Sequence, residues 1–341
     1  MVTRQEVATR AGVSPSTVSY VLSGKRPTSE STRRKVLAAV EELGYVPNAT
    51  ASALAAREAR TIALHLYPDV YGIDSISVDY IVGMRQRVQE LGANLLIPFI
   101  DSSGRDEFVR FLRSGVADAL ILMDVATGDW REMAALSESM PTVLLGSTGR
   151  QGTRLPFVES DFAQIGSTAV HFSVQRGHRR LLLLRRVLPD PEGHINRTGQ
   201  AMMVGARMAA HRTRTRLETL ELPTLSKYAS RVADRLCAPD GPTVVLCENG
   251  ELASVVAAVA NERGMVLGQH YSAMVLGGEA RQHPNLEPQF TEIATDRSAM
   301  GRMCVDKAVA AARDGLASVT SKMFPPVLID RGTVCPPPVL H

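Results

Sequence analysis

From residue 61 onward, short apolar runs alternate with longer amphipathic stretches, and this alternation restricts the possible folds more than any other feature of the sequence. Apolar runs of this length are typical of buried strands, whereas the stretches between them have the spacing of helices. Alternating strands and helices predict parallel sheets with helices on both faces. The predicted strands are 61–67, 93–100, 117–123, 141–147, 179–184, 243–247 and 271–278, and the predicted helices are 80–91, 106–113, 163–175, 199–211 and 252–263.

The alternating pattern restarts near residue 163, after its first four strands. Two similar α/β halves predict two lobes with a cleft between them. Ligands of open α/β sheets bind beyond the carboxyl ends of the strands, so this cleft is the expected ligand site. The length of 341 residues fits two or three domains.

All of the excess positive charge lies in the first sixty residues. This head has nine Lys or Arg and five Asp or Glu residues, a net charge of +4, whereas the rest of the chain has 29 and 30, a net charge of −1. A basic head on a near-neutral body suggests that the head meets phosphate. An ordinary solvated surface explains the charge equally well, so charge alone does not decide between the two.

The head contains the start and stop signals of three short helices. Thr3 and Glu6 have the spacing of a capping box. Ser14 is a natural N-cap of the second helix, and Pro15 follows it at the position where the missing N–H costs nothing. Ser29 begins the third helix. Each helix ends at a glycine: Gly12, Gly24 and Gly44.

Two helices joined across a tight glycine turn form a helix-turn-helix unit, whose second helix can enter the major groove of DNA. Hydroxyls and amide N–H groups at a helix start suit phosphate oxygens. Small three-helix units also occur as plain structural modules, so the helices alone do not establish DNA binding. The exposed positions of the second helix are expected to be Pro15, Ser16, Thr17, Ser19 and Tyr20.

The stretch from Thr3 to about Leu54 closely resembles the DNA-binding head of the LacI/GalR (lactose-repressor) family, through the strings "GVSPSTVS", "VLSGK" and "ELGYVPNA". The resemblance implies that the helix Ser14–Leu22 reads DNA. Many members have Arg or His where Tyr20 stands, and Tyr cannot make the bidentate contact of Arg to guanine. The DNA contacts that follow from the resemblance are Thr3, Ser14, Pro15, Ser16, Thr17, Ser19, Tyr20, Lys25, Ser29, Asn48, Ala51 and Leu54.

Residues 47–60 are the expected hinge. Asn48 can cap a short Ala-rich helix, which is marginal in water by itself, so a flexible linker is the alternative. The resemblance implies that paired hinge helices fold on DNA and press Leu54 into the minor groove, with Ala51 on the same face. Ser52 stands where the family usually has Arg, which predicts weaker backbone contacts.

The body resembles the periplasmic-binding-protein-like core of the same family, through "GVADALIL", "RGHRRLLLL", "PTVVLCEN" and "IDRGTV". The expected fold is therefore an N-terminal all-α helix-turn-helix head with a hinge helix, followed by an α/β core of two lobes with parallel sheets. The implied division is a head over 1–46, a hinge over 47–60 and a core over 61–341. The N-lobe takes about 61–160 and 296–327, and the C-lobe about 161–292 and 328–341.

The effector pocket departs from the family pattern. Met202, Gly250 and Gly277 stand where related pockets often have an Arg and two Asp, and Arg185 and Arg186 follow a strand where glycines are usual. These changes favour an anionic effector, because Arg suits carboxylates and phosphates. Arginines that are merely solvated or salt-bridged, and a core with no effector, are the alternatives. The candidate lining residues are Asp74, Asp124, Arg185, Arg186, Thr198 and Asn249.

The sequence gives little support for a catalytic function or for an exported protein. The sequence has no GxSxG, HExxH or phosphate-loop string, and no metal or other cofactor is expected. The N-terminus has no apolar signal segment and no run is long enough to cross a membrane, which argues against an exported solute-binding protein. The four cysteines, Cys237, Cys247, Cys304 and Cys335, have no ligand spacing and are expected to be reduced packing residues.

We therefore predict a cytoplasmic, non-enzymatic transcription regulator that binds double-stranded DNA. A homodimer would place two heads on a pseudo-palindromic operator, and an effector in the cleft would shift the affinity for DNA. Repression is favoured, because a bound dimer blocks a promoter by occupancy. Activation, a tetramer and a ligand-free core that serves as a dimerisation platform remain open at this point.

Overall fold

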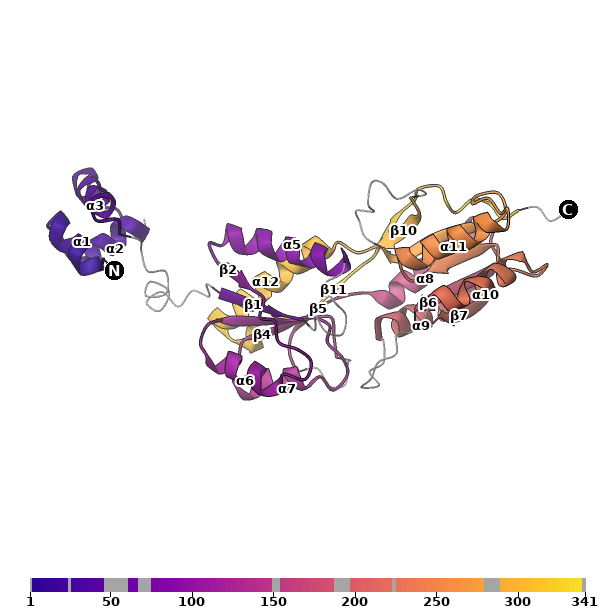
Figure 1. The fold of residues 1–341 in the computed structure, drawn as a ribbon, viewed down its shortest axis with the longest axis horizontal. Helices are drawn as coiled ribbons and strands as arrows, with labels where there is room; N and C mark the ends of the chain where they lie inside the picture. Colours follow the sequence, from indigo (N-terminus) through magenta and orange to yellow (C-terminus); the bar gives the residue numbers. More distant parts are fainter. Residues whose placement is uncertain are drawn as a thin grey trace. The chain divides into compact units, whose positions relative to one another are not determined.

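The computed structural model describes residues 2–23, 26–45, 61–66, 75–148, 154–186, 197–222, 225–278 and 289–338. The chain forms two compact units, Met1–Glu58 and Ala59–His341 (Figure 1). The smaller unit is the helical head, and the larger one is an α/β core with two six-stranded sheets.

The head has the three expected helices, α1 (Arg4–Ala11), α2 (Pro15–Ser23) and α3 (Glu30–Leu43). The Thr3 hydroxyl accepts a hydrogen bond from the amide of Glu6, whose carboxylate accepts one from the amide of Thr3, which confirms the capping box. Gly12 and Gly44 end α1 and α3 in the left-handed conformation, which glycine adopts at little cost. The core of the head is made of Val7, Ala8, Ala11, Val18, Val21, Val36, Ala39 and Tyr45.

The first sheet of the core belongs to the N-lobe and has the strand order β11-β5-β4-β3-β1-β2. All of its neighbouring strands are parallel. The strands are β1 (Thr61–His65), β2 (Asn94–Leu96), β3 (Ala119–Leu122), β4 (Thr142–Leu145), β5 (Phe157–Ser160) and β11 (Lys322–Phe324).

Helices cover both faces of the N-lobe sheet, as Figure 1 shows. Ile62 and Leu64 of β1 pack towards α5 (Ser75–Glu90) and α12 (Arg297–Asp314). Ala63, between them, packs in the other cluster with α6 (Arg105–Arg113) and α7 (Trp130–Ser137). Successive side chains of a strand point to opposite faces, so burial on both faces explains the continuous apolar runs of the sequence.

The second sheet belongs to the C-lobe and has the order β12-β10-β9-β8-β6-β7. It is parallel except for β12, which runs antiparallel to β10. The strands are β6 (Arg180–Arg186), β7 (Arg216–Leu222), β8 (Val244–Cys247), β9 (Ser272–Gly278), β10 (Thr291–Ala294) and β12 (Val327–Ile329).

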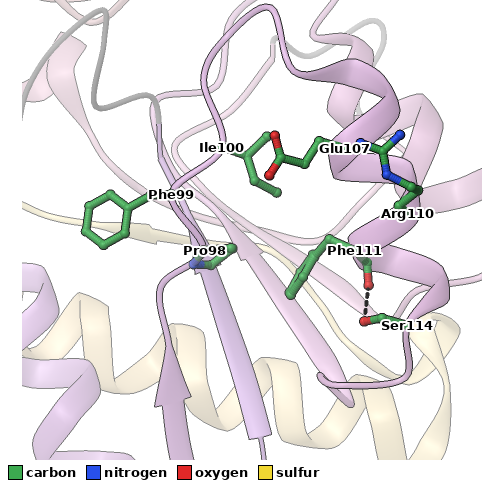
Figure 2. Close-up of a pocket in the computed structure, with 7 residues that line it drawn as sticks. All are labelled: Pro98, Phe99, Ile100, Glu107, Arg110, Phe111 and Ser114. Atoms are coloured by element: carbon green, nitrogen blue, oxygen red, sulfur yellow. Dashed lines mark hydrogen bonds between the residues drawn. The ribbon is translucent and has the colours of Figure 1, made fainter.

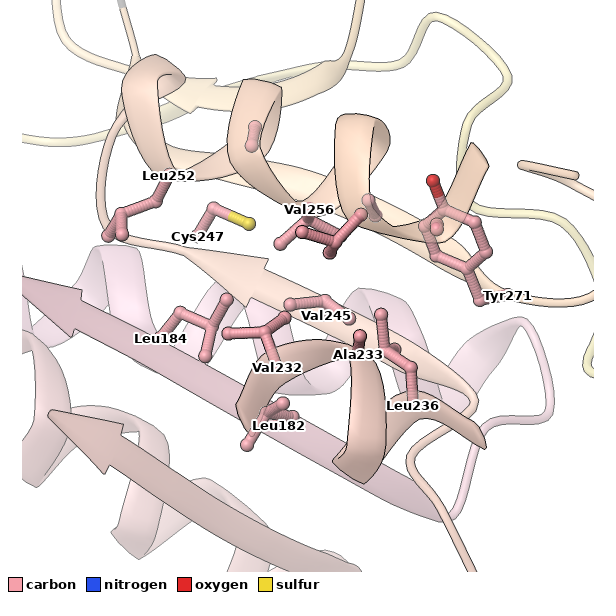
Figure 3. Packing of buried hydrophobic residues seen from close by; sticks show 14 of the residues in the cluster. Leu182, Leu184, Val232, Ala233, Leu236, Val245, Cys247, Leu252, Val256 and Tyr271 are labelled. Carbon is pink, nitrogen blue, oxygen red and sulfur yellow. The ribbon is translucent and has the colours of Figure 1, made fainter. Parts of the chain in front are cut away.

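The C-lobe sheet is also covered on both faces. Leu182 and Leu184 pack against α10 (Leu225–Cys237) and α11 (Gly250–Glu262), in the cluster that Figure 3 shows. Leu181 and Leu183 pack in the opposite cluster, with α8 (Phe162–Gln175) and α9 (Arg197–Thr213). The chain passes between the lobes three times: from β5 to α8, from β10 to α12, and from β11 to β12.

Each of the predicted strands and helices of the core is present, with bounds that differ by a few residues. Several others escaped prediction. The helices α10 and α12, of 13 and 18 residues, were not predicted. The edge strand β7 mixes leucine with charged residues, so it lacks an apolar run, and α7, the single-turn 3₁₀ helix η1 (Leu316–Ser318) and the strands β5, β10, β11 and β12 are short. Cys247 and Cys304 are buried packing residues as predicted, whereas Cys237 is exposed, so the prediction was wrong for that thiol.

Reciprocal glycine contacts hold one helix pair in each lobe. In the C-lobe, a Cβ on Gly166 of α8 would lie 2.0 Å from the carbonyl oxygen of Met202 on α9, and one on Gly205 of α9 would lie 1.9 Å from that of Ala163 on α8. In the N-lobe, Gly83 of α5 and Gly301 of α12 make the same kind of contact with Ser298 and Tyr80, respectively. Only glycine allows these helix backbones to approach so closely.

Candidate functional site

The second helix of the head begins with a capped turn. The Ser14 hydroxyl accepts a hydrogen bond from the amide of Thr17 at 3.2 Å and lies 2.9 Å from the Thr17 hydroxyl. Pro15 is the first residue of α2. Two of the predicted DNA contacts, Ser14 and Thr17, are thus also the residues that fix the start of α2. Pro15 has no N–H and the Val18 amide donates to the Ser14 carbonyl, so the amide of Ser16 is the group of this first turn that can donate to an anion.

The outer face of α2 is defined by its buried residues. Val18 and Val21 lie in the core of the head. Successive helical residues are rotated by about 100°, so Ser16 and Tyr20 lie on the opposite side of α2. The Ser16 side chain is exposed. The hydroxyl of Ser19 instead donates to the carbonyl of Pro15 at 3.1 Å, one turn earlier in the helix.

Tyr20 is half-buried although it lies on this outer face. Arg26 lies beside it, with its guanidinium carbon 5.0 Å from the centre of the Tyr20 ring, in cation–π contact. Arg26 itself is exposed. Sequence reasoning missed this arginine, which follows Tyr20 by six residues.

Two further predicted contacts of the head are helix caps. Thr3 caps α1, and Ser29 caps α3 by accepting from the amide of Thr32 at 3.2 Å. Both side chains are exposed at helix starts, where phosphate is favoured. The predicted contacts Lys25, Asn48, Ala51 and Leu54, together with the hinge, lie outside the described residues.

In the C-lobe, the carboxyl ends of the strands hold a buried arginine. Arg185, near the end of β6, has a side chain 7% exposed and makes a 2.7 Å ion pair with Glu221 of β7. A Cβ placed on Gly199 of α9 would meet both Arg185 and Glu248, so these two side chains meet under the first turn of α9. Acidic groups therefore already oppose the charge of Arg185.

Two other predicted effector residues neighbour this group in the chain, because Thr198 precedes Gly199 and Asn249 follows Glu248. The Asn249 side chain caps α11 by accepting from the amide of Leu252 at 2.9 Å. Thr198 is exposed on the first turn of α9, and Asp124 follows β3 in the N-lobe with a positive φ of 55°. Arg186 ends β6, but its side chain lies outside the description, as does the whole of Asp74.

Met202, which stands where related pockets often have Arg, is buried in the apolar cluster between α8, α9 and the sheet. Near it lies Arg297, which the sequence did not indicate. The Arg297 guanidinium donates to the carbonyl oxygen of Gly277 at the end of β9, and its Nη1 lies 3.9 Å from Asp79 Oδ2 of α5. Arg297 therefore connects the first helix of the N-lobe to the carboxyl edge of the C-lobe sheet.

Arg297 also lies beside the buried Tyr80, whose pKa is raised by burial against the opposing effect of that guanidinium. The side chain of Arg297 is 6% exposed, and its Nη1 atom is buried without a hydrogen-bond acceptor within the described part of the chain. A buried N–H of a charged group without an acceptor is costly, because it has lost its water. This nitrogen is therefore a place where a ligand oxygen would be stabilised.

A third buried arginine, Arg131, has a structural task in the N-lobe. Arg131 is fully buried and makes a 2.6 Å ion pair with Asp129, and its Nη1 lies 3.0 Å from His65 Nδ1. It also donates to the carbonyl oxygens of Met123 and Asp124. Arg131 thereby fixes the loop that follows β3.

The hollow in Figure 2 lies between the edge strand β2 and α6. It measures about 400 Å³ and is lined by Pro98, Phe99, Ile100, Glu107, Arg110, Phe111 and Ser114. Phe99, with 71% of its surface exposed, stands at its side. None of the predicted effector residues lines it, so we assign it no ligand.

Neither a metal centre nor a membrane segment is found among the described residues. No cluster of three or more His, Cys, Asp or Glu side chains there could hold a metal ion. In the same part of the chain, no helix combines the length and the apolar character that crossing a bilayer requires.

Comparisons with known proteins match both parts of the chain. The family described as "Bacterial regulatory proteins, lacI family" matches residues 3–48. The one described as "Periplasmic binding proteins and sugar binding domain of LacI family" matches residues 63–304.

Among curated relatives, the chain is 28% identical over 274 residues to the HTH-type transcriptional regulator AglR of Rhizobium meliloti, across 79% of this chain and 75% of that protein. It is 26% identical over 275 residues to the repressor PurR of Vibrio parahaemolyticus, across 78% of each. The match to catabolite control protein A of Priestia megaterium, at 28% identity, covers 58% of each chain, less than two thirds of that relative.

Among solved structures, the Lac repressor dimer bound to operator and the anti-inducer ONPF matches with a TM-score of 0.77 and 23% identity, over 98% of this chain and 99% of that one. The CelR–cellobiose complex matches with a TM-score of 0.67 and 20% identity, over 98% of this chain and all of the other. These structures share the fold of a head and a two-lobed core.

Proposed function

Because the chain belongs to the LacI family of bacterial regulatory proteins, we propose that it is a transcriptional repressor controlled by a small molecule in its two-lobed core. The observation that carries the proposal is the outer face of α2. A capped, neutral helix start and the exposed Ser16 stand opposite the buried Val18 and Val21. Such a helix fits the major groove, with its amide groups and hydroxyls towards phosphate.

The repressor acts as a homodimer, in which two heads bind the half-sites of a pseudo-palindromic operator. Its place of action is the cytoplasm, where the DNA lies, and it has no catalytic role. The relatives support this reading, because they are named as transcriptional regulators and repressors. The hinge contacts at Ala51 and Leu54, and the phosphate contacts at Lys25 and Asn48, belong to the proposal as the sequence predicts them.

The effector binds at the carboxyl edge of the C-lobe sheet and changes the equilibrium between two arrangements of the lobes. It can do so only as far as its affinity for the two arrangements differs. Arg185 is already opposed by Glu221, so an anionic effector needs another cation. Arg297 is the first candidate, because its buried Nη1 lies 3.9 Å from Asp79, a looser ion pair than the 2.7 Å pair of Arg185 with Glu221, and Arg186 is the second candidate.

The proposal is tested by selecting bound duplexes from genomic fragments with the purified full chain. We expect a twofold-symmetric site upstream of one or a few genes and repression of a reporter placed behind it. Ser16→Asp, which puts a negative charge on the outer face of α2, should reduce affinity for that site at least tenfold. The matched control is Ser254→Asp on the exposed side of α11, which should leave affinity unchanged.

Three results would contradict parts of the proposal. Equal binding to every duplex would exclude sequence-specific recognition. Higher reporter expression with the protein present would replace repression by activation. If metabolite extracts change neither the duplexes that are selected nor the expression of the reporter, the result would favour a core that serves only to hold the dimer together.

A further inference from the structure

Exposed arginines gather at the amino edge of the C-lobe sheet, where α9 ends and β7 begins. From residue 197 to residue 216 the sequence has five arginines and neither Asp nor Glu. Arg207 and Arg212 of α9 and Arg214 in the following turn are exposed. Arg179, directly before β6, is also exposed, and its Nη1 donates to the carbonyl oxygen of Thr213 at 3.2 Å. We call Arg179, Arg207, Arg212 and Arg214 the edge patch.

The edge patch lies at the opposite ends of the strands from the proposed effector site. The strands β6 and β7 are parallel neighbours, so Arg179 and the turn before β7 lie at their amino ends. Arg185, in contrast, lies near the carboxyl end of β6. The edge patch is therefore a separate surface of the core.

The charge of the edge patch is not neutralised within the protein. The neighbouring Arg216 pairs with Glu218 at 2.8 Å and with Asp240 at 3.0 Å. The four arginines of the edge patch have no carboxylate partner within the described part of the chain. A guanidinium keeps its charge throughout the physiological pH range. The patch thus presents a fixed positive surplus, which a polyanion would offset.

The backbone of Arg214 favours glycine, not arginine. Its φ of 52° lies in the left-handed region, and its amide donates to the carbonyl of His211 at 3.2 Å. The helices α1 and α3 end in the same hydrogen-bonding pattern, but there Gly12 and Gly44 take the left-handed position. The end of α9 thus holds an arginine where glycine would fold more easily, so the turn itself does not explain the charge.

We propose that the edge patch binds the phosphates of duplex DNA without regard to sequence. The planar fork of Arg matches phosphate oxygens, and such contacts attract any duplex. Residues 197–216 include no Phe, Tyr or Trp on which the bases of a single strand could stack. A duplex, whose phosphates are outside and whose bases are already stacked, therefore fits the patch better. This contact goes beyond the proposed function, because it lies on the core and not on the head.

The test measures binding of the full chain to a fluorescent duplex of mixed sequence, by anisotropy, between about 50 and about 200 mM NaCl. The variant is Arg212→Ala combined with Arg214→Gly. We expect its affinity at the lowest salt to fall at least about tenfold. The slope of log affinity against log salt should also fall by about 2, because each lost phosphate contact contributes about 0.9.

Three controls separate this contact from other causes. Glycine suits the backbone of residue 214 and alanine suits a helix, so the melting temperature of the double variant should not fall. Arg110→Ala combined with Arg313→Ala removes the same charge from exposed sites of the N-lobe and should change neither affinity nor slope. In a chain that also carries Ser16→Asp, which weakens the head, the patch variant should cause the same fold loss.

Four results would overturn the inference. An unchanged slope would show that the patch does not contact phosphate, and an equal loss in the N-lobe control would attribute binding to net charge. A loss that disappears in the Ser16→Asp chain would show that the patch acts through the head. Binding of phosphatidylglycerol vesicles, with an unchanged duplex affinity in the patch variant, would assign the patch to a membrane surface. None of the four affects the proposed function, which depends on the outer face of α2.

Discussion

Three serines of the head show how the same side chain takes different tasks. Ser14 caps α2, Ser19 donates to a carbonyl one turn back, and Ser16 is exposed on the outer face. Their neighbours in space, and not their chemistry, decide which one is left to contact a partner. The same holds for the arginines of the core, of which Arg131 and Arg185 are neutralised by acids.

Ion pairs also determine how the stability of the N-lobe depends on pH. Glu90 of α5 accepts from Arg302 of α12 at 2.8 Å through each carboxylate oxygen and also pairs with Arg87. Hydrogen bonds from Arg302, and then from Arg87, lower the pKa of Glu90 to about 2. A carboxyl with a lowered pKa contributes stability above its unfolded pKa and loses it as the pH falls towards the folded one.

We therefore expect Glu90→Gln to lower the unfolding temperature at neutral pH and to reduce its fall between about pH 4.5 and about pH 2. The measurement is the melting temperature of the full chain at a series of pH values. Glu107→Gln, on the exposed side of α6, is the control and should follow the wild type. A Glu90→Gln curve parallel to the wild-type curve would exclude this linkage.

A closely packed pair of helices is an element that the two lobes share: α5 with α12 in the N-lobe and α8 with α9 in the C-lobe. In each lobe, two helices on one face of the sheet cross at two glycines, Gly83 and Gly301 in the N-lobe and Gly166 and Gly205 in the C-lobe. In all four cases the neighbouring atom is backbone, which cannot move aside as a flexible side chain can. The crossing therefore depends on the absence of a Cβ.

Substituting one of these glycines should separate the helices. Gly205→Ala places a Cβ 1.9 Å from the carbonyl oxygen of Ala163, so we expect a loss of about 1–3 kcal/mol in the free energy of unfolding, although alanine is the better helix former. Denaturant unfolding of the full chain measures this loss in the free energy of unfolding.

The matched control is Gly250→Ala at the start of α11, where a Cβ meets nothing within 4 Å. Its expected change is within about 0.5 kcal/mol. Equal effects of the two substitutions would contradict the packing explanation.

At the scale of the whole core, signals between the lobes can pass through three crossing segments and Arg297. This side chain bonds the end of β9 in the C-lobe and faces Asp79 of α5 in the N-lobe. A ligand oxygen at its Nη1 would change the contacts of both lobes at once. Such differential contact is what couples ligand binding to a conformational change.

If the effector is anionic, inorganic phosphate and citrate should raise the melting temperature of the full chain more than NaCl of equal ionic strength. Binding at a hundred times the dissociation constant adds about 2.7 kcal/mol, which corresponds to a shift of several degrees. Arg297→Gln should abolish the shift, whereas Arg313→Gln, at an exposed local pair with Asp314, should keep it.

Stabilisation by neutral sugars alone would contradict an anionic effector. An anion shift that survives Arg297→Gln would place the anion elsewhere in the core.

The sequence predicted the head and the two α/β halves well, because both depend on local signals. Caps such as Thr3, Ser14 and Ser29, and apolar runs such as Leu181–Leu184, are recognisable without knowledge of their neighbours. The edge strand β7 escaped prediction because most of its side chains are only partly buried and its leucines are interspersed with charged residues. The candidate effector residues were the least predictable part, since Arg185 and Asn249 turned out to have partners within the C-lobe.

The order of caps, turns and apolar runs by itself determined the three helices of the head and the two α/β halves of the core, because a helix cap and the apolar run of a buried strand are each visible within a few residues of sequence. Only the tertiary structure decided which arginine charges are already paired within the protein and which remain available to a binding partner. The sequence alone does not distinguish three arginines whose surroundings differ. Arg185 pairs with Glu221, Arg26 lies over the ring of Tyr20, and Arg297 donates to the carbonyl of Gly277. Their surroundings differ because folding brings distant segments together, and electrostatic interactions depend on that distance.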